Sequence, residues 1–463
     1  MNALPFGWTS VLIADVAHIV GGGTPPSKDE ECFAPPGQGV PWITPADLSG
    51  YRDQTISRGT RDLSTKGLAS CSAKVMPAGT VLFSSRAPIG YVAIASNPVT
   101  TNQGFKSFVL PKEIDSRFAY YQLKHIKPVA EALATGTTFK ELSGSAAAKL
   151  PFMVAPHFEQ KRIADKLDTV LTRVDAVNTR LARVAPILKR LRQSVLAAAT
   201  SGRLTEDWRL KNAADVSADP SSPPPELSQM IIPPTWMWRS VSELSAKVTD
   251  GVHKKPTYID NGVPFLTVGN LTAGPGIDFS TTRFVSEDDH AEYCKRTYPE
   301  RDDILVTKDG TLGVVRRIET DQPFSIFVSL ALVKLVDKRQ SPYVSLALAS
   351  PHLQIQMKGV GTGLQHIHLT DLRKDLLPLP PLDEQAEIVR RVESLFAFAD
   401  RLEARLQTAQ SATERLTPAL LAKAFRGELV PQDPNDEPAS ELLRRLQQDA
   451  PSSSTRRGRK SAA

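Results

Sequence analysis

Residues 156–204 read PHFEQKRIADKLDTVLTRVDAVNTRLARVAPILKRLRQSVLAAATSGRL, and the other parts of the chain are arranged around this segment. Its apolar residues follow one another in steps that alternate between four and three: Ile163, Leu167, Val170, Val174, Val177, Leu181, Val184, Leu188, Leu191 and Val195. A period of 3.5 residues is typical of the seam of a coiled coil, whereas an ordinary globular helix has a wider apolar stripe. The segment therefore predicts a long helix that pairs with another helix.

The ends of this segment also suit a helix. Pro156 fits a first helical turn, and Glu159 complements the positive end of the helix dipole. Gly202 fits the left-handed residue that follows a last turn. Pro186 lies inside the segment, and we expect it to bend the helix locally. At 1.5 Å per residue, the helix would be about 65–70 Å long.

A second copy of the segment lies 225 residues further along the chain. Identical residues at this offset are found for Pro156, Glu159, Gln160, Ile163, Asp175, Arg180, Leu181, Leu191, Leu196, Ala197, Ala199, Gly202 and Leu204. We expect each copy to bury its seam on the other; two separate bundle helices that duplicated with the gene are the alternative. The predicted seam contains Ile163, Leu167, Val170, Val174, Val177, Leu181, Leu188, Leu191, Ile388, Val392, Leu395, Leu402, Leu406 and Leu416.

The remaining sequence divides into two similar domains. Residues 1–155 contain strand-like runs at Val40–Thr44, Thr80–Ser84, Tyr91–Ala95 and Ser107–Leu110, and a helical run, Arg117–Ala134, that we expect to be interrupted near Pro128. After the first helix (156–204), residues 205–232 read as a linker rich in Pro and Ser. A second domain (233–380), the second helix (381–429) and a polar, basic tail (430–463), expected to be disordered, complete the chain. The fold class is α+β.

The second domain repeats the framework of the first. Gly-Val-Pro at 39–41 matches Gly-Val-Pro at 262–264, and Leu82-Phe83-Ser84-Ser85 matches Leu305-Val306-Thr307-Lys308. The linker joins the end of the first helix to the domain that precedes the start of the second helix. Because an antiparallel pair brings those two ends together, we prefer it over a parallel pair.

Composition bounds the class of protein. The chain of 463 residues is long enough for two or three domains, and no run of eighteen apolar residues could span a membrane. Its start, MNALPFGWTS, does not resemble a secretory leader, and its three scattered cysteines form neither a disulfide framework nor a zinc site. We expect an intracellular, cytoplasmic protein. The net charge of +6 includes four charges from the 456–460 cluster, so net charge alone is weak evidence for nucleic acid.

Catalytic signatures are few. Gly21-Gly22-Gly23-Thr24 lacks the Gly-Lys-Ser/Thr of a phosphate loop and reads as a flexible turn. The chain has no Asn-Pro-Pro-aromatic segment of the kind that adenine methyltransferases use, and no Gly-x-Ser-x-Gly elbow. Two nearby imidazoles, His366 and His368, do not make a metal site. We therefore predict no catalytic residue, no metal site and no cofactor on this chain.

Polar and basic loops are the better candidates for a binding function, because hydroxyl, amide and basic side chains can bond phosphates or base edges. The candidate DNA contacts are Ser84, Ser85, Arg86, Thr101, Asn102, Gln103, Lys106, Lys140, Lys254, Lys255, Thr307, Lys308, Thr311, Gln365 and His366, with Thr137-Thr138-Phe139 and Thr362-Gly363-Leu364 beside them. Surface turns are rich in the same residues, so each alone is better explained as a turn residue. The evidence is collective: two similar frameworks carry different loops.

The pattern resembles the specificity (S) subunit of type I restriction–modification enzymes, the HsdS family. The matching elements are Leu4-Pro5-x-Gly7-Trp8, Ile232-Pro233-Pro234-x-Trp236, the two Gly-Val-Pro motifs, Leu-Pro-Leu-Pro-Pro-Leu-x-Glu-Gln at 377–385, and Gly-x-Leu at each helix end. The first copy departs from the Leu-Pro-x-Pro-Pro phrase at 150–156 but keeps Pro156, Glu159 and Gln160.

The resemblance implies two target-recognition domains that each read one half of a split DNA sequence. It implies two long helices, paired as an antiparallel coiled coil, that set the spacing and dock two methyltransferase (M) subunits. The expected partners are double-stranded DNA, the M subunits and restriction (R) subunits, which carry S-adenosylmethionine, ATP and Mg; no membrane is expected. A coiled-coil scaffold whose domains bind proteins, or an enzyme with an unrecognised site such as a fused methyltransferase, are the alternatives.

Overall fold

The computed structural model describes residues 4–86, 88–136, 140–212, 222–357, 359 and 365–449. The chain divides into two compact units, and we call residues 1–180 with 409–463 the first unit and residues 181–408 the second unit. Each unit contains one of the predicted domains and a part of both long helices. Among the described residues, we find no helix whose length and apolar character would suit a membrane span.

The first unit combines three sheets with short helices. Strand β1 (Thr9–Leu12) pairs antiparallel with β11 (Pro151–Val154). The largest sheet has the order β2-β10-β7-β8-β5, with bounds His18–Gly21, Lys106–Val109, Val81–Phe83, Val92–Ala95 and Thr55–Ile56. A further sheet has the order β3-β6-β4-β9, with bounds Phe33–Ala34, Arg61–Leu63, Val40–Ile43 and Thr100–Thr101. The helices are α1 (Thr65–Ala69), α2 (Ser116–His125), α3 (Lys127–Leu133) and α4 (Gly144–Ala147).

These elements confirm the predicted mixed fold. The four strand-like runs correspond to β4, β7, β8 and β10, and the helical run corresponds to α2 and α3. Helix α2 ends at His125, because Pro128 takes a first-turn position of α3, where a missing N–H leaves no helical hydrogen bond unmade. Strand β7 is buried throughout, which explains its continuous apolar run.

The second unit repeats this arrangement. Strand β12 (Met237–Ser240) pairs antiparallel with β20 (Leu376–Leu379). One sheet has the order β13-β19-β16-β17, with bounds Ser245–Asp250, Leu330–Leu335, Ile304–Thr307 and Val315–Arg317. The other has the order β15-β14-β18, with bounds Arg283–Val285, Val263–Leu266 and Ser325–Ile326. The helices are α8 (Val241–Leu244), α9 (Val268–Thr272), α10 (Glu287–Cys294), α11 (Ser341–Leu348), α12 (Pro351–Gln354) and α13 (Leu369–Lys374).

The first long segment forms two consecutive helices, α5 (His157–Ala182) and α6 (Val184–Thr200), and the second forms α14 (Leu382–Ala424). The break at Arg183 has a local cause. The proline ring of Pro186 clashes with the carbonyl group of the residue four positions earlier and supplies no N–H for it. That residue is Ala182, where α5 ends, so the predicted bend is a break between two helices.

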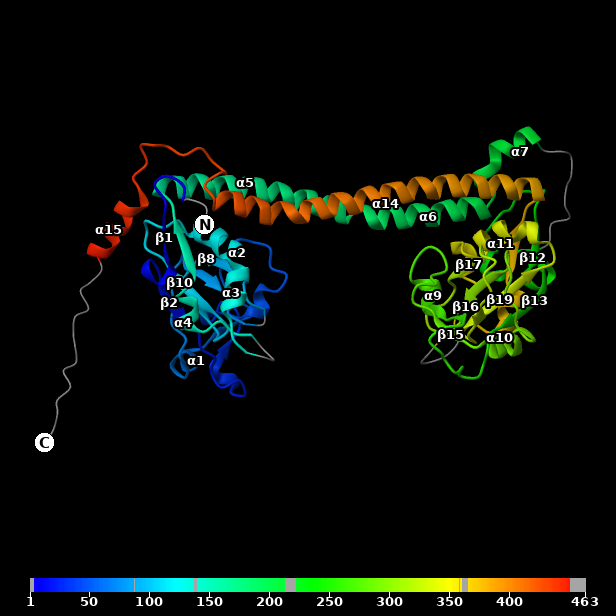
Figure 1. Ribbon diagram of the computed structural model, residues 1–463, viewed down its shortest axis with the longest axis horizontal. Helices are drawn as coiled ribbons and strands as arrows, with labels where there is room; N and C mark the ends of the chain where they lie inside the picture. The colour runs from blue at the N-terminus through cyan, green and yellow to red at the C-terminus, as the bar shows by residue number, and fades with distance from the viewer. Residues whose placement is uncertain are drawn as a thin grey trace. The chain divides into compact units, whose positions relative to one another are not determined.

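In the first unit, the start of α5 packs against the end of α14 (Figure 1). Ile163, Leu167 and Leu171 share one hydrophobic core with Leu421 and Phe425. In the same unit, the ring of Phe425 lies 5.4 Å from that of Phe118, measured between centroids. Thus the end of α14 closes the core of the N-terminal domain.

In the second unit, the end of α6 packs against the start of α14. Val195 and Ala199 share a core with Ile388 and Val392. The Arg192 guanidinium links the same helices, because it donates to Asp400 at 2.6 Å and to Glu403 at 2.9 Å. Since the start of one helix meets the end of the other in each unit, the helices pair in antiparallel fashion, as predicted.

The seam prediction was wrong at three positions. Val177 is 42% exposed, Leu395 is 36% exposed and Leu416 is 43% exposed. On α5 the buried stripe runs through Leu167, Leu171 and Val174 instead, so it rotates away from Val170 and Val177. The steps of three and four therefore fix the pairing of the helices but not each buried residue.

Two segments are more ordered than predicted. The linker 205–232 begins with α7 (Glu206–Asn212), where Asp207 accepts from Arg391 at 2.6 Å. The tail 430–463 contains α15 (Ala439–Asp449), an amphipathic helix whose Leu442 and Leu443 enter the core of the first unit. Residues 213–221 and 450–463 lie outside the described residues. Apolar residues at helical spacing outweigh the polar composition that suggested disorder.

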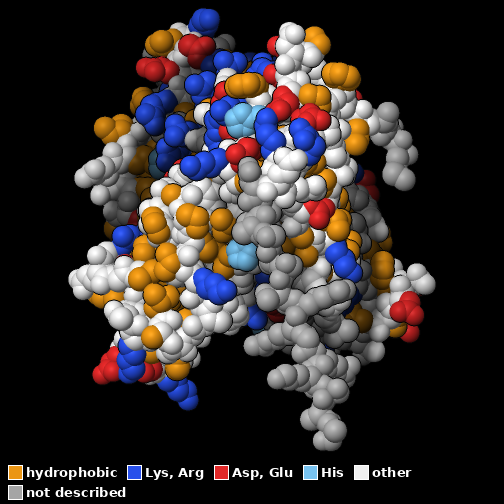
Figure 2. All heavy atoms as spheres, turned by 90° about the vertical axis from the view of Figure 1, so that its left-hand side faces the viewer, with side chains coloured by type: hydrophobic (Ala, Val, Ile, Leu, Met, Phe, Trp, Pro, Cys, Tyr) orange, Lys and Arg blue, Asp and Glu red, His pale blue; other side chains and the backbone are white. Residues whose placement is uncertain are grey.

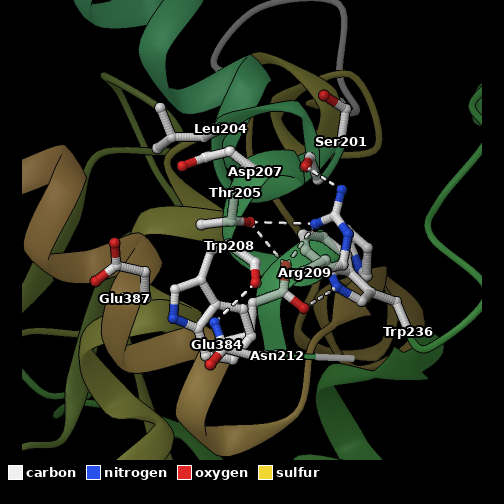
Figure 3. A network of polar contacts seen from close by, with 12 residues as sticks. Ser201, Leu204, Thr205, Asp207, Trp208, Arg209, Asn212, Trp236, Glu384 and Glu387 are labelled. Carbon is white, nitrogen blue, oxygen red and sulfur yellow. Dashed lines mark hydrogen bonds and ion pairs between the residues drawn. The ribbon is translucent and has the colours of Figure 1, made fainter. Parts of the chain in front are cut away.

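A buried tryptophan–glutamate hydrogen bond ties each domain to its helix. Trp8 donates from Nε1 to Glu159 at 3.0 Å in the first unit, and Trp236 donates to Glu384 at 2.8 Å in the second. Around Glu384, Thr205 donates at 2.7 Å and Arg209 forms an ion pair at 2.5 Å (Figure 3). The sequence repeat thus preserves one contact from the domain start to the first turn of the long helix.

The two glutamates differ in their surroundings. At the offset of 225, Pro434 stands where the second unit has Arg209, so the equivalent guanidinium is replaced by a proline ring. Burial raises the pKa of Glu159, although the Trp8 hydrogen bond and the Arg162 charge favour its carboxylate form. The Glu159 charge is therefore less well compensated than the Glu384 charge.

We expect Glu384→Gln to destabilise the protein by about 2–4 kcal/mol, because it leaves the partly buried Arg209 without its ion pair. Glu159→Gln should cost less than about 1 kcal/mol, because a neutral amide suits a site that disfavours charge. Calorimetric melting of both variants measures the difference. Equal losses, or a larger loss for Glu159→Gln, would contradict this reading of the two sites.

Candidate nucleic-acid interface

In the first unit, backbone hydrogen bonds bring together four loops that the sequence separates. Gly23 N donates to Thr101 O at 2.9 Å, Ser85 N donates to Gly104 O at 2.7 Å, and Leu142 N donates to Ser85 O at 2.9 Å. We call the loops 21–28, 84–91, 101–106 and 135–142 the first loop cluster; its residues 87 and 137–139 lie outside the described residues.

The second unit repeats these bonds. Val252 N donates to Ile326 O at 2.9 Å, Lys308 N donates to Ser329 O at 2.9 Å, and Ile367 N donates to Lys308 O at 2.8 Å. We call the loops 250–258, 307–314, 326–329 and 365–368 the second loop cluster. Thr362, Gly363 and Leu364 lie outside the described residues. The two clusters therefore share one backbone arrangement while their side chains differ.

Close packing holds the first of the four loops in place. A Cβ atom at Gly22 would collide with the backbone of Asn102, and one at Gly251 would collide with the carbonyl oxygen of Ile326. Gly22 and Gly23, which belong to the run that we interpreted as a flexible turn, are thus packed contacts in which only glycine lets the backbones approach.

Several predicted contact residues are structural instead. Ser84, Ser85, Thr101 and Thr307 are buried, so their side chains cannot reach a base edge. Ser84 Oγ accepts from Tyr91 N at 2.8 Å, and Thr307 Oγ1 accepts from Val314 N at 2.9 Å. These hydroxyls close the turns that follow β7 and β16. For these four residues, the prediction that the side chain contacts DNA directly was wrong.

Other predicted residues of the first cluster lie at its surface. Gln103 and Lys140 are exposed, and Thr24 donates a hydrogen bond to the Gln103 side chain. Arg86 and Lys106 share the carboxylate of Glu141, at 3.7 and 3.8 Å. Asn102 is half-buried, and its Oδ1 accepts from Gly104 N at 2.9 Å. The cluster thus presents amides and partly neutralised cations.

The predicted residues of the second cluster are more basic. Lys254, Lys255, Thr311 and Gln365 are exposed, and His366 is half-buried beside Asp309. Lys308 is largely buried, and its Nζ lies 3.5 Å from both Asp250 and Asp309. The charge of Lys308 is therefore compensated inside the cluster.

Sequence reasoning missed Asp250, His253 and Arg296. Asp250 Oδ1 accepts from Arg296 Nη2 at 2.5 Å and lies 3.1 Å from His253 Nε2. Burial opposes ionisation of Asp250, but His253, Arg296 and Lys308 outweigh it and lower the pKa of the carboxyl group. No signal in one sequence joins Arg296 to residues more than forty positions earlier, because α10 intervenes between them.

Charge does not by itself mark an interface. Figure 2 shows one face of the molecule, on which Lys and Arg side chains gather together with Asp and Glu side chains in the upper part.

Among the described residues, no group of three or more His, Cys, Asp or Glu side chains is placed to hold a metal ion. His366 and His368 stack edge to face at 4.6 Å between ring centroids.

Comparison with known proteins identifies the family. The model of the type I restriction modification DNA specificity domain matches twice, over residues 5–185 and 233–409. The EcoBI specificity subunit of Escherichia coli is 33% identical over 344 residues, which cover 73% of this chain and 71% of that protein. The MjaIX specificity subunit of Methanocaldococcus jannaschii is 29% identical, over 93% of this chain and 95% of that protein.

Solved structures share the fold. A chain from a study of complex assembly and conformational transition of the type I R-M system superposes with a TM-score of 0.70 at 19% identity, covering 92% of this chain and all of that chain. The HsdS subunit from Thermoanaerobacter tengcongensis gives 0.57 at 19% identity, covering 92% of this chain and 98% of that chain. Given the repeated family match and these relatives, the chain belongs to the type I restriction–modification specificity family. It is the DNA specificity subunit of a type I restriction–modification system and is itself non-catalytic.

Proposed function

We propose that the first loop cluster reads one half of a bipartite DNA target and that the second loop cluster reads the other half. One observation carries the proposal: the same backbone hydrogen bonds support both clusters, while the exposed side chains differ. A duplicated scaffold with unlike surfaces suits two readers of unlike sequences. Double-stranded DNA is then the direct partner of this chain.

The exposed residues divide by their chemistry. Lys254, Lys255 and Lys140 suit phosphate contacts, which set position and affinity. The amides of Gln103 and Gln365 suit base edges, because an amide pairs in two places with adenine. Each amide is exposed on its own cluster.

We further propose that the paired helices dock two methyltransferase subunits. Large apolar side chains remain exposed on them: Phe158, Val177 and Leu416 in the first unit, and Ile187, Leu395 and Phe398 in the second. Exposed apolar surface on paired helices suits a protein partner. Restriction subunits join this core in the cytoplasm, and the partner subunits carry S-adenosylmethionine, ATP and Mg.

The double variant Lys254→Gln/Lys255→Gln should weaken DNA binding by the chain assembled with its methyltransferase partner. We expect roughly tenfold lower affinity and a salt dependence shallower by about 1–2 in log–log slope, because two phosphate contacts are lost. Gel-shift titrations at several salt concentrations measure both values.

The control is Lys338→Gln, since Lys338 pairs with Glu300 and Asp303 at the end of β16 opposite to the second loop cluster. An equal loss in the control would contradict the assignment. If the chain bound random DNA as tightly as the sequence that its complex methylates, the result would favour the alternative of a scaffold that binds proteins.

Phe398→Asp should weaken assembly with the methyltransferase at least tenfold, because a carboxylate cannot replace the apolar contact that the exposed ring would make with the partner. The chain should keep its fold, since the ring is exposed. Analytical ultracentrifugation measures assembly. Val336→Asp is the control, since Val336 is exposed, directly follows β19 and belongs to neither long helix. Unchanged assembly for Phe398→Asp would oppose docking at this surface.

A further inference from the structure

Asp250 is an ionised carboxylate inside the second loop cluster. Its side chain lies at the end of β13 and is 6% exposed. Its two oxygens meet three cationic or imidazole groups: Oδ1 meets Arg296 and His253, and Oδ2 lies 3.5 Å from Lys308. A buried carboxylate with these partners is fixed in direction, so it can hold a second side chain in a defined position.

Of these three partners, Arg296 combines a guanidinium group with a side chain that is largely open to solvent. Its side chain is 56% exposed, whereas the Lys308 side chain is 13% exposed and is shared with Asp309. Only Nη2 contacts Asp250 and His253; among the described residues, Arg296 Nη1 and Nε form no hydrogen bond. The guanidinium is therefore held at Nη2, and its Nη1 and Nε donors remain unused by the described residues.

The surface beside Arg296 is hollowed. A cavity of about 240 Å³ is lined by Val252, His253, Tyr293, Arg296 and Ile326 among others. Two of these residues, Val252 and Ile326, are joined by the backbone hydrogen bond that defines the second loop cluster. The free guanidinium donors thus lie on the loop cluster itself and not on a remote surface.

We propose that Arg296, positioned by Asp250, reads a guanine in the half-target contacted by the second loop cluster. The inference rests on the proposed function of that cluster. Guanine presents two acceptors, O6 and N7, in the major groove, and the two N–H bonds of Arg296 Nη1, which Asp250 and His253 leave unused, can donate to both. Adenine presents an acceptor and a donor there, so its amino group would oppose one guanidinium N–H.

Among its described residues, the first loop cluster has no equivalent of this arrangement. Gly21 ends β2 at the place where Asp250 ends β13, so no side chain can hold a guanidinium there. Gln103, which accepts from Thr24, is an exposed polar group of that cluster. The guanine contact therefore belongs to one half-target only.

The test uses the full chain assembled with its methyltransferase partner and expressed in a host without other adenine methylation. Methylome sequencing gives the target of the unaltered chain, and the same measurement on Arg296→Gln shows which positions relax. We expect one guanine in one half-target to become degenerate. Binding to DNA with adenine at that position, about 5- to 100-fold weaker for the unaltered chain, should become nearly equal to binding of the original target.

Two further variants make the result specific. Asp250→Asn tests the positioning role: it should relax the same guanine while leaving the other positions specified. Arg301→Gln is the control, because Arg301 also pairs with an aspartate, donating from Nε and Nη2 to Asp321, but at the opposite end of β16. The control should leave the target unchanged, and the melting temperature of each variant is measured alongside.

An unchanged target for Arg296→Gln overturns the inference and leaves the two-reader function standing. Uniform loss of methylation by a variant that melts normally also overturns it, since that indicates a phosphate contact. Relaxation in both half-targets overturns it as well. A target of the unaltered chain that is not bipartite overturns the proposed function, which distinguishes the two failures.

Discussion

The burial of α14 at both of its ends is the constraint on which the rest of the structure depends. Its start completes the core of the second unit through Ile388 and Val392, and its end completes the core of the first unit through Leu421 and Phe425. The core of the first unit therefore requires apolar side chains from a segment far away in the sequence, whereas the core of the second unit is completed by the helix that directly follows β20. Because burying one such side chain stabilises a protein by about 1.5–3 kcal/mol, neither unit is complete without its share of this helix.

The loop clusters depend on these cores. In both units a buried hydroxyl residue at the end of a sheet strand closes a turn: Ser84 directly follows β7, and Thr307 is the last residue of β16. The next residue in each unit donates its backbone N–H to the neighbouring loop. The framework thus uses buried side chains and backbone groups, while the exposed side chains are free to differ. Under the proposed function, this separation lets one framework serve two readers, because the exposed side chains that the framework does not use differ between the clusters.

Much of the fold could be predicted from the sequence. The offset of 225 residues and the apolar steps of three and four predicted two units and a helix pair, because periodicity and duplication are visible in one dimension. The position of the linker 205–232 between the first helix and the second domain predicted that the pair is antiparallel. The exposure of Val177, Leu395 and Leu416 could not be predicted, because it depends on how the α5 stripe rotates at Leu171 and how Pro186 breaks the helix. The order of α15 was missed because its Leu442 and Leu443 are stabilised by a core at the other end of the chain.

The candidate site was less predictable than the fold. The residues around the turns were located correctly as loops, but Ser84 and Thr307 are buried by strands that pair only in three dimensions. Asp250 and Arg296 meet across 46 residues, and their contact needs the path of α10 between them. Composition and motif spacing carry no information about such a pair.

Methylome sequencing of a host with and without this gene tests the central claim of two unlike readers most directly. We expect gene-dependent adenine methylation in a motif with two short, different specific parts separated by a stretch of unspecified bases. A continuous motif, a palindrome read twice, or no gene-dependent methylation beside an active methyltransferase partner would contradict it.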